Sequence, residues 1–155
     1  MQFVARRATP EDVAELVRLR AVMFTSMGID AAEQTWQSGC EAHLLERLSD
    51  GRIVGAVVDS PDVGGLACSG LAEVALRIPA PARAPGPRAY LSSFSTDPRW
   101  RRRGMARAVL ALLLDELGKR GVNRVELHAT ADGVDLYRAF GFGPRPGGIE
   151  MSLDL

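Results

Sequence analysis

The spacing of apolar residues changes along the chain, and a three- to four-residue spacing marks four segments as helical. These predicted helices span about residues 9–26, 31–49, 103–119 and 132–139. Thr9 and Pro10 suit the cap and the first turn of the first helix. Asp30 with Glu33 resembles a capping pair for the second helix. Gly121 stands where a left-handed residue would end the third helix.

Strand-like segments, rich in apolar and β-branched residues, fill most of the remaining chain. These predicted strands span about residues 3–7, 52–59, 66–78, 88–96, 122–129 and 149–155. A turn at 62–65 joins two of them as a hairpin, and the proline-rich stretch 79–87 is expected to be a surface loop. The order β-α-α-β-β-β-α-β-α-β predicts an α/β fold, a mixed sheet with helices on both faces.

The length of 155 residues fits one domain, which we expect to span residues 1–155. Hydrophobic residues make up 46% and charged residues 25% of the chain, as in ordinary globular proteins. The formal net charge is zero, which disfavours nucleic acid and membrane surfaces as partners. The longest apolar run, residues 109–114, is far shorter than a membrane span.

The two cysteines bear on the compartment in which the protein works. Cys40 and Cys68 match neither a metal site nor a disulfide framework. Residues 1–9 lack the apolar stretch of a secretory signal. We therefore expect a cytoplasmic protein with reduced thiols.

Positive charge is concentrated in one short segment, since five arginines fall between Arg99 and Arg107. This segment follows a predicted strand and a tight turn at Asp97-Pro98, and it leads into the long third helix. A helix start exposes unpaired backbone N–H groups and attracts anions, and Gly104 leaves room for a phosphate to approach. Each cation there costs about 0.3–1 kcal/mol unless an anion is bound. The spacing therefore favours a phosphate site, with a solvated basic loop as the alternative.

The spacing Arg101-x-x-Gly104-x-Ala106 after a strand resembles motif A of the GNAT N-acetyltransferase superfamily. The resemblance implies that this loop binds the pyrophosphate of CoA through the Arg101 side chain and the backbone amides of 103–106. It also implies that the preceding strand lies beside the pantetheine. The cofactor-binding residues implied in this way are Phe94, Ser95, Thr96, Arg101, Arg102, Arg103, Gly104, Met105, Ala106 and Thr130.

A second stretch, residues 127–142, is similar to motif B of the same family and ends in Tyr137-x-x-x-Gly141-Phe142. The general-acid position of the family falls on Tyr137. Many members carry Asn where Thr130 stands, and Thr cannot reproduce the two-ended hydrogen bonding of an amide. This difference concerns one pantetheine contact and not the choice of cofactor.

The resemblance extends from about residue 3 to residue 155 and is weakest over 31–50. It implies a GNAT-like, mixed but mostly antiparallel central sheet with helices on both faces. It also implies acetyl-CoA as the cofactor and an amine, either a small molecule or a peptide, as the acceptor. Family members often dimerise, so a homodimer is compatible with the resemblance.

The chemistry implied is direct attack of a neutral primary amine on the thioester, with Tyr137 protonating the leaving thiolate. The amine could lose its proton in solution, without a general base, or to Glu73 or His128 as the base, and Ser92 or Ser93 could order a water. The substrate-binding residues implied by their position in the family's fold are Phe24, Met27, Trp36 and Tyr90.

Two other functions are compatible with parts of the sequence. The same fold could hold acyl-CoA as a regulatory module without turnover, which the absence of a carboxylate on strand 88–96 mildly favours and Tyr137 disfavours. The basic segment could contact nucleic acid, although its only stacking aromatic is Trp100.

Overall fold

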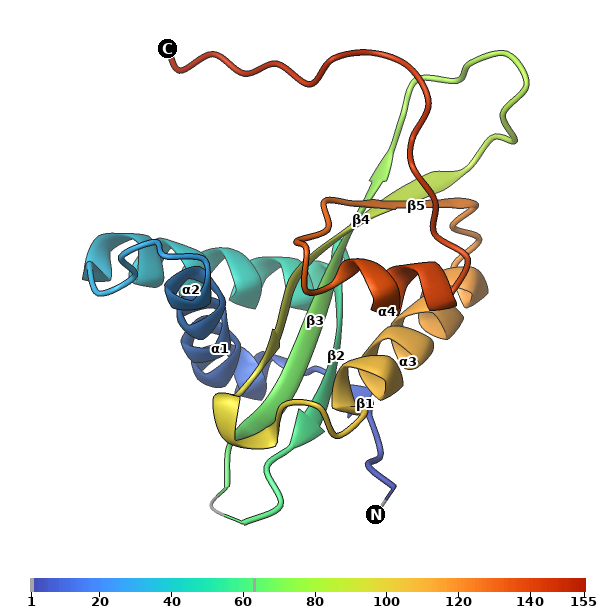
Figure 1. Cartoon of the computed structure of the whole chain (residues 1–155). Helices are drawn as coiled ribbons and strands as arrows, with labels where there is room; N and C mark the ends of the chain where they lie inside the picture. The colour runs from blue at the N-terminus through green and yellow to red at the C-terminus, as the bar shows by residue number, and fades with distance from the viewer. Residues whose placement is uncertain (1, 63) are drawn as a thin grey trace.

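A computed structural model describes residues 2–62 and 64–155 of the chain (Figure 1). The strands are β1 (Arg6–Arg7), β2 (Ile53–Asp59), β3 (Leu66–Leu76), β4 (Pro87–Thr96) and β5 (Arg124–Leu127). The α-helices are α1 (Val13–Ser26), α2 (Gln34–Asp50), α3 (Met105–Lys119) and α4 (Val134–Ala139), and short 3-10 helices span η1 (Pro10–Asp12) and η2 (Pro98–Trp100).

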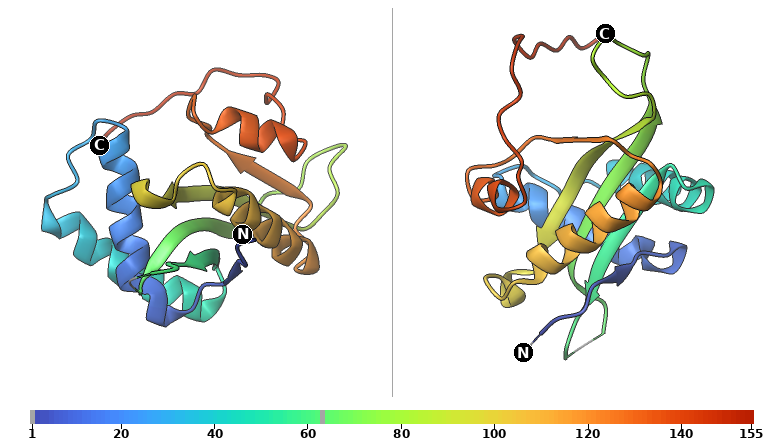
Figure 2. Two further views of the ribbon diagram at one scale, coloured as in Figure 1. Left: turned by 60° about the horizontal axis from the view of Figure 1, so that its bottom comes forward. Right: turned by 90° about the vertical axis from the view of Figure 1, so that its right-hand side faces the viewer.

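The five strands form one sheet in the order β1-β2-β3-β4-β5. Neighbouring strands are antiparallel from β1 to β4, and only β4 and β5 run parallel. Helices α1 and α2 cover one face of the sheet and α3 covers the other (Figure 2). This arrangement confirms the predicted mixed, mostly antiparallel sheet with helices on both faces.

The period-two alternation of β2 and β3 supplies a separate hydrophobic core to each face. On one face, Leu16 and Leu19 of α1 pack with Ile53 and Val57 of β2. On the other face, the apolar side of α3 packs against small residues of the sheet. The fully buried helix residues of this second core are Val109, Leu110, Leu113 and Leu117. The sheet therefore presents two distinct surfaces on which a site can be built.

Two helix starts differ in detail from the predictions. The segment after Thr9 begins as the 3-10 turn η1, in which the Asp12 carboxylate accepts a hydrogen bond from the Thr9 N–H at 2.8 Å. Helix α2 begins at Gln34, three residues later than expected, because Glu33 itself is the cap and accepts from the Thr35 N–H at 2.7 Å. Gly121 has a φ of 78°, which confirms the predicted left-handed residue.

The predicted last strand, residues 149–155, is wrong. This segment makes no strand, and its alternating Ile149, Met151, Leu153 and Leu155 are all exposed. Gly147 and Gly148 both have positive φ values, and the C-terminal trace runs away from the sheet (Figure 1). An alternating pattern suits a strand, but a strand also needs a partner edge, and β5 offers only four residues.

The remaining boundary differences are small. The first strand is limited to Arg6–Arg7, and β5 is shorter than the predicted 122–129. The predicted turn at 62–65 includes Val63, which lies outside the described residues. Within 2–62 and 64–155, no helix is both long enough and apolar enough to cross a membrane.

Candidate active site

A bulge in β4 marks the centre of the candidate site. The pairing of β3 with β4 shifts between Ser69↔Ser95 and Leu71↔Ser92, so Ser93 and Phe94 have no ladder partner. Ser93 has a φ of 54°, a left-handed value that is uncommon outside glycine. A β-bulge of this kind re-aims side chains and interrupts regular strand pairing.

Gly70 of β3 makes this bulge sterically feasible. A Cβ atom on Gly70 would lie only 2.6 Å from Cζ of Phe94, a distance that no real side chain tolerates. The Phe94 ring therefore occupies the space that a side chain at 70 would need. Ser92 and Ser93 both line the cavity on the α1/α2 face, whereas Phe94 packs into the core on the α3 face.

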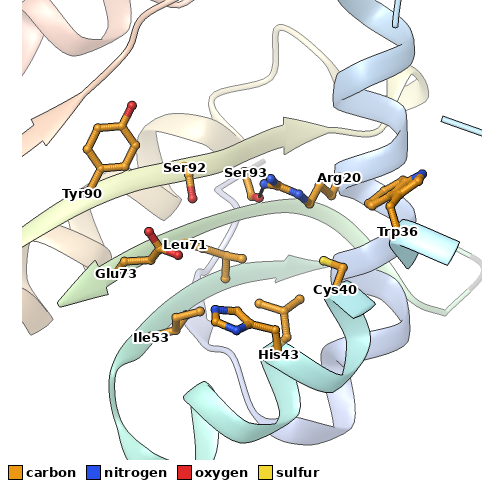
Figure 3. A pocket seen from close by; sticks show the side chains of 11 residues that line it. Arg20, Trp36, Cys40, His43, Ile53, Leu71, Glu73, Tyr90, Ser92 and Ser93 are labelled. Atoms are coloured by element: carbon orange, nitrogen blue, oxygen red, sulfur yellow. Dashed lines mark hydrogen bonds between the residues drawn. The ribbon is translucent and has the colours of Figure 1, made fainter. Parts of the chain in front are cut away.

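The acceptor cavity, as we call the hollow beside Ser92 and Ser93, has a volume of about 450 Å³ (Figure 3). It lies between α1, α2 and the open face of β2, β3 and β4. Its lining residues are Arg20, Trp36, Cys40, His43, Leu44, Ile53, Leu71, Glu73, Tyr90, Ser92 and Ser93. Volumes of this order are typical of small-molecule sites.

Three predicted residues, Glu73, Trp36 and Tyr90, come together in the acceptor cavity. Phe24 is not a lining residue of the cavity, but its ring packs edge-on against that of Trp36, with a centroid distance of 5.5 Å. Met27 does not line it and is 51% exposed at the end of α1.

Sequence reasoning missed Arg20, Cys40 and His43, which also line the acceptor cavity. The helical spacing could have indicated Arg20 and Cys40 as residues on the same helix faces as the predicted ones. Arg20 lies one turn before Phe24, and Cys40 lies one turn after Trp36. Burial raises the pKa of the Cys40 thiol, so this side chain is a neutral lining group at physiological pH.

The start of the Arg-rich loop is anchored by Asp97. Its carboxylate caps η2 by accepting from the Arg99 N–H at 3.1 Å, and it forms an ion pair with Arg18 of α1 at 3.1 Å. The hydrogen bond from the Arg99 side chain, together with the other Arg99 and Arg18 contacts, lowers the pKa of Asp97 to about 2. The loop is therefore fixed at one end by charge-assisted contacts.

The other end of the loop opens into the N-terminus of α3. Arg102 and Gly104 have positive φ values of 61° and 85°, and Gly104 is the residue that caps the helix. A Cβ atom on Gly104 would meet no atom within 4 Å, so the backbone there is open to a ligand. Met105 is buried, which means that it offers only its backbone N–H to this site. The residues fit a diphosphate, which α3 would hold with its free N–H groups.

The arginines of the loop have different surroundings. Arg101 donates to the Thr96 carbonyl at 3.2 Å and to Oγ of Ser26 at 2.8 Å, so it also ties the loop to α1. The guanidinium of Arg103 lies over the Trp100 ring, 4.8 Å from its centroid. Among the described residues, no carboxylate forms an ion pair with Arg101, Arg102 or Arg103. An anion at the start of α3 would supply the missing negative charge.

Tyr137 of α4 packs against the core on the α3 face and lines a hollow beside β5. Its ring packs edge-on against Phe94 of the bulge, with centroids 5.9 Å apart. Burial, and to a smaller degree Cys68, raises the pKa of Tyr137 to about 12. The phenol is therefore protonated at every physiological pH and is available as a proton donor.

The other predicted residues lie close to these elements. The Thr96 hydroxyl lies 3.2 Å from the Cys68 thiol, and Ser95 is buried opposite Ser69. The Thr130 carbonyl accepts from the Gly133 N–H at 3.0 Å at the turn before α4.

His128 lies outside the acceptor cavity. It lines a separate hollow of about 790 Å³ beside β5 and α4, and its Nδ1 is 3.4 Å from a carboxylate oxygen of Glu150. Its side chain is 71% exposed. Tyr90 and Tyr137 also line this second hollow, so Tyr90 borders both. Of the two candidate bases, only Glu73 faces the acceptor cavity.

Comparison with known proteins decides the family. The model of the acetyltransferase (GNAT) family matches residues 13–142. The chain belongs to this family. The acetyltransferase therefore uses acetyl-CoA as its acyl donor, which confirms the enzyme class and the cofactor expected from the two motifs.

Solved structures agree with this assignment. A GCN5-related N-acetyltransferase from Ralstonia eutropha JMP134 is 28% identical, with a TM-score of 0.83 and coverage of 99% of both chains. A predicted acetyltransferase from Clostridium acetobutylicum, solved with acetyl-CoA, is 19% identical, with a TM-score of 0.85 and coverage of 97% of this chain and 96% of that one.

A glucosamine-6-phosphate N-acetyltransferase from Arabidopsis thaliana is 17% identical to the acetyltransferase. Its TM-score is 0.76, with coverage of 99% of this chain and all of that one. At this level of identity the likeness concerns the fold alone. No curated protein matches the chain.

Proposed function

We propose that this enzyme transfers the acetyl group of acetyl-CoA to a primary amine by direct attack, with Tyr137 as the general acid. The observation that carries the proposal is that Tyr90, next to the β4 bulge, borders both the acceptor cavity and the hollow lined by Tyr137. An amine in this cavity and the Tyr137 hydroxyl would therefore reach the same thioester, held beside Tyr90, from different sides. Holding both groups in place is itself a large part of catalysis.

Acetyl-CoA supplies an activated acyl carbon in a thioester. We infer that the start of α3 holds its diphosphate through the N–H groups of residues 103–106, with Arg101 and Arg102 adding positive charge. Backbone N–H groups of the bulge near Phe94 would bind the pantetheine and polarise the acyl carbonyl. Thr130, at the turn before α4, would contact the pantetheine through its hydroxyl.

The proposed reaction needs one side chain that accepts a proton and another that donates one. The amine nitrogen forms a bond to the acyl carbon while the carbon–sulfur bond breaks. Glu73 receives the amine proton, directly or through a water held by Ser92, and the Tyr137 hydroxyl donates its proton to the departing sulfur. Glu73 is preferred to His128 as the base because only Glu73 lines the acceptor cavity.

Ligand binding and turnover together test this function. Acetyl-CoA should raise the melting temperature, since a ligand that binds only the folded state must stabilise it. Incubation with a panel of primary amines should release free CoA thiol. Binding without thiol release from any amine would instead support a regulatory module, and no binding would overturn the site at the start of α3.

A further inference from the structure

The acceptor cavity has a cationic group at one end that the proposed chemistry does not use. Arg20 of α1 donates from Nη1 to the Ser93 hydroxyl, and its guanidinium lies 4.9 Å from the centroid of the Phe24 ring. Within the part of the chain that the structure describes, no carboxylate pairs with Arg20, and its Nε and Nη2 groups have no hydrogen-bond acceptor. Its charge is held in place but not neutralised.

Arg18, only two residues earlier, shows what a structural arginine of the same helix does. It pairs with Glu15 at 2.8 Å and with Asp97 at 3.1 Å, and it donates to the Leu66 carbonyl. The difference between the two arginines is one of surroundings. Arg18 is satisfied by the fold, whereas Arg20 keeps unused donors at the wall of a cavity.

The opposite end of the cavity is negative. Glu73 of β3 stands directly across from Tyr90 of β4, and both lie at the far end from Arg20 and Trp36 (Figure 3). Ser92 and Ser93 lie between these two ends, and Ile53 and Leu71 provide apolar surface. The cavity therefore has a positive end, a negative end and a middle with both hydroxyl and apolar groups.

We propose that the amine acceptor also carries an oxyanion group, a carboxylate or a phosphate, which Arg20 binds while the amine lies toward Glu73. This inference rests on the proposed function and names the substrate class for it. A guanidinium binds planar oxyanions with two parallel hydrogen bonds, and the two free donors of Arg20 suit this geometry. Aromatic surface borders the guanidinium, since Arg20 lies over the Phe24 ring and Phe24 packs edge-on against Trp36.

Matched pairs of amines with and without the oxyanion test the proposal. Phenylalanine is compared with phenethylamine for a carboxylate, and phosphoethanolamine with ethanolamine for a phosphate. Binding of each to the CoA-bound protein is measured by calorimetry, and acetylation by release of CoA thiol. At least one oxyanion member should bind and react about tenfold better than its neutral counterpart, as expected for hydrogen bonds to a charged group. The pair with the larger difference identifies whether Arg20 binds a carboxylate or a phosphate.

Substitution of Arg20 locates the effect. Arg20→Met should abolish the preference, mainly by raising KM for the oxyanion member, while acetyl-CoA affinity stays the same. Arg20→Lys should retain part of it, since a lysine keeps the charge but not the paired geometry. Ser93→Ala is the matched control, because it removes the hydroxyl that Arg20 contacts but keeps the guanidinium. The preference should survive in Ser93→Ala even if the rate falls.

Three results would overturn the proposal. They are equal or better binding of both neutral amines, no measurable binding of either oxyanion member, and a preference that persists in Arg20→Met. Loss of the preference in Ser93→Ala as well, with part of it kept in Arg20→Lys, would show that the Ser93 hydroxyl must hold the guanidinium in place and would still support the proposal. Acetyl-CoA binding and acetylation of a neutral amine would still support the proposed function in each case, so the two failures are distinguishable.

Discussion

At the scale of single residues, the roles proposed for Tyr137 and Glu73 depend on where the two side chains lie. The Tyr137 hydroxyl belongs to a half-buried ring on the α3 face, and the Glu73 carboxylate belongs to the cavity on the other face. Their roles lead to different kinetic predictions.

Tyr137→Phe should lower kcat by about 100-fold or more, because it removes the proton donor but leaves the ring contacts with Phe94. The pKa of Tyr137, about 12, also predicts that kcat has no decline caused by this group below about pH 11. Steady-state rates from pH 7 to 10.5 measure both effects. Unaltered turnover in the variant, with unchanged acetyl-CoA affinity, would remove Tyr137 from the mechanism.

Glu73→Gln should lower kcat by about 100-fold, whereas His128→Gln should leave it nearly unchanged. The expected difference arises because Glu73 lines the acceptor cavity and His128 is exposed beside Glu150. Rates for both variants should be compared at a pH above 9, where more of the amine is already neutral. Recovery of the Glu73 variant there would support its role as base, and a larger loss in His128→Gln would reverse the assignment.

At the scale of elements, the turn between β4 and α3 concentrates the constraints on cofactor binding. Asp97 anchors the loop to α1 and η2, and Gly104 opens the start of α3. Asp97 contributes through its carboxylate and Gly104 through its backbone geometry, and each can be tested apart from the chemistry. The sequence alone predicted this turn well, because a strand, a proline, a glycine and a helical period follow one another within a few residues.

Gly104→Val should weaken acetyl-CoA binding by about tenfold or more, because it strains a residue with a φ of 85° and fills the open approach to the backbone. Gly118→Val, in the same helix, is the matched control. A Cβ atom at Gly118 would also meet no atom within 4 Å, and its φ is not positive. Calorimetric titration with acetyl-CoA measures the affinity of both variants. Equal affinities would count against a diphosphate at this end of α3.

Asp97→Asn should lower the free energy of unfolding by about 1–3 kcal/mol at pH 7, because it weakens charge-assisted contacts to Arg18 and Arg99. The folded-state pKa of Asp97, about 2, lies below its ordinary value of 3.8. Its stabilisation is therefore complete above pH 4 and is lost as the pH falls toward 2. Acid unfolding curves should be shallower for the variant. Parallel curves would mean that other carboxylates dominate acid unfolding.

At the scale of the whole molecule, the main departure from expectation is the C-terminal segment. Residues 149–155 alternate apolar and polar side chains, yet they lie away from the sheet and expose their apolar side chains (Figure 2). Local pattern predicted a strand, but whether a strand forms depends on a free edge of suitable length. The segment therefore adds little to the folded domain as the structure shows it.

Removal of residues 149–155 should leave the melting temperature and acetyl-CoA affinity nearly unchanged, because exposed residues with few contacts contribute about 0.5 kcal/mol or less. Melting curves over a hundredfold range of protein concentration measure this together with the mass in solution. A homodimer stays a prediction. A concentration-dependent melting temperature that disappears on truncation would show that the segment binds a second copy.

The sequence by itself determined the helices and strands that have strong periods, the left-handed Gly121, and the two motifs that identify the family. These features depend on neighbours within a few residues, so local spacing is sufficient to predict them. Tertiary structure decided which side chains share the acceptor cavity, because Arg20, Trp36 and Glu73 lie on α1, α2 and β3 and meet only after the sheet forms. It also decided the bulge at Ser93 and the unpaired C-terminal segment, since strand register depends on contacts between distant parts of the chain.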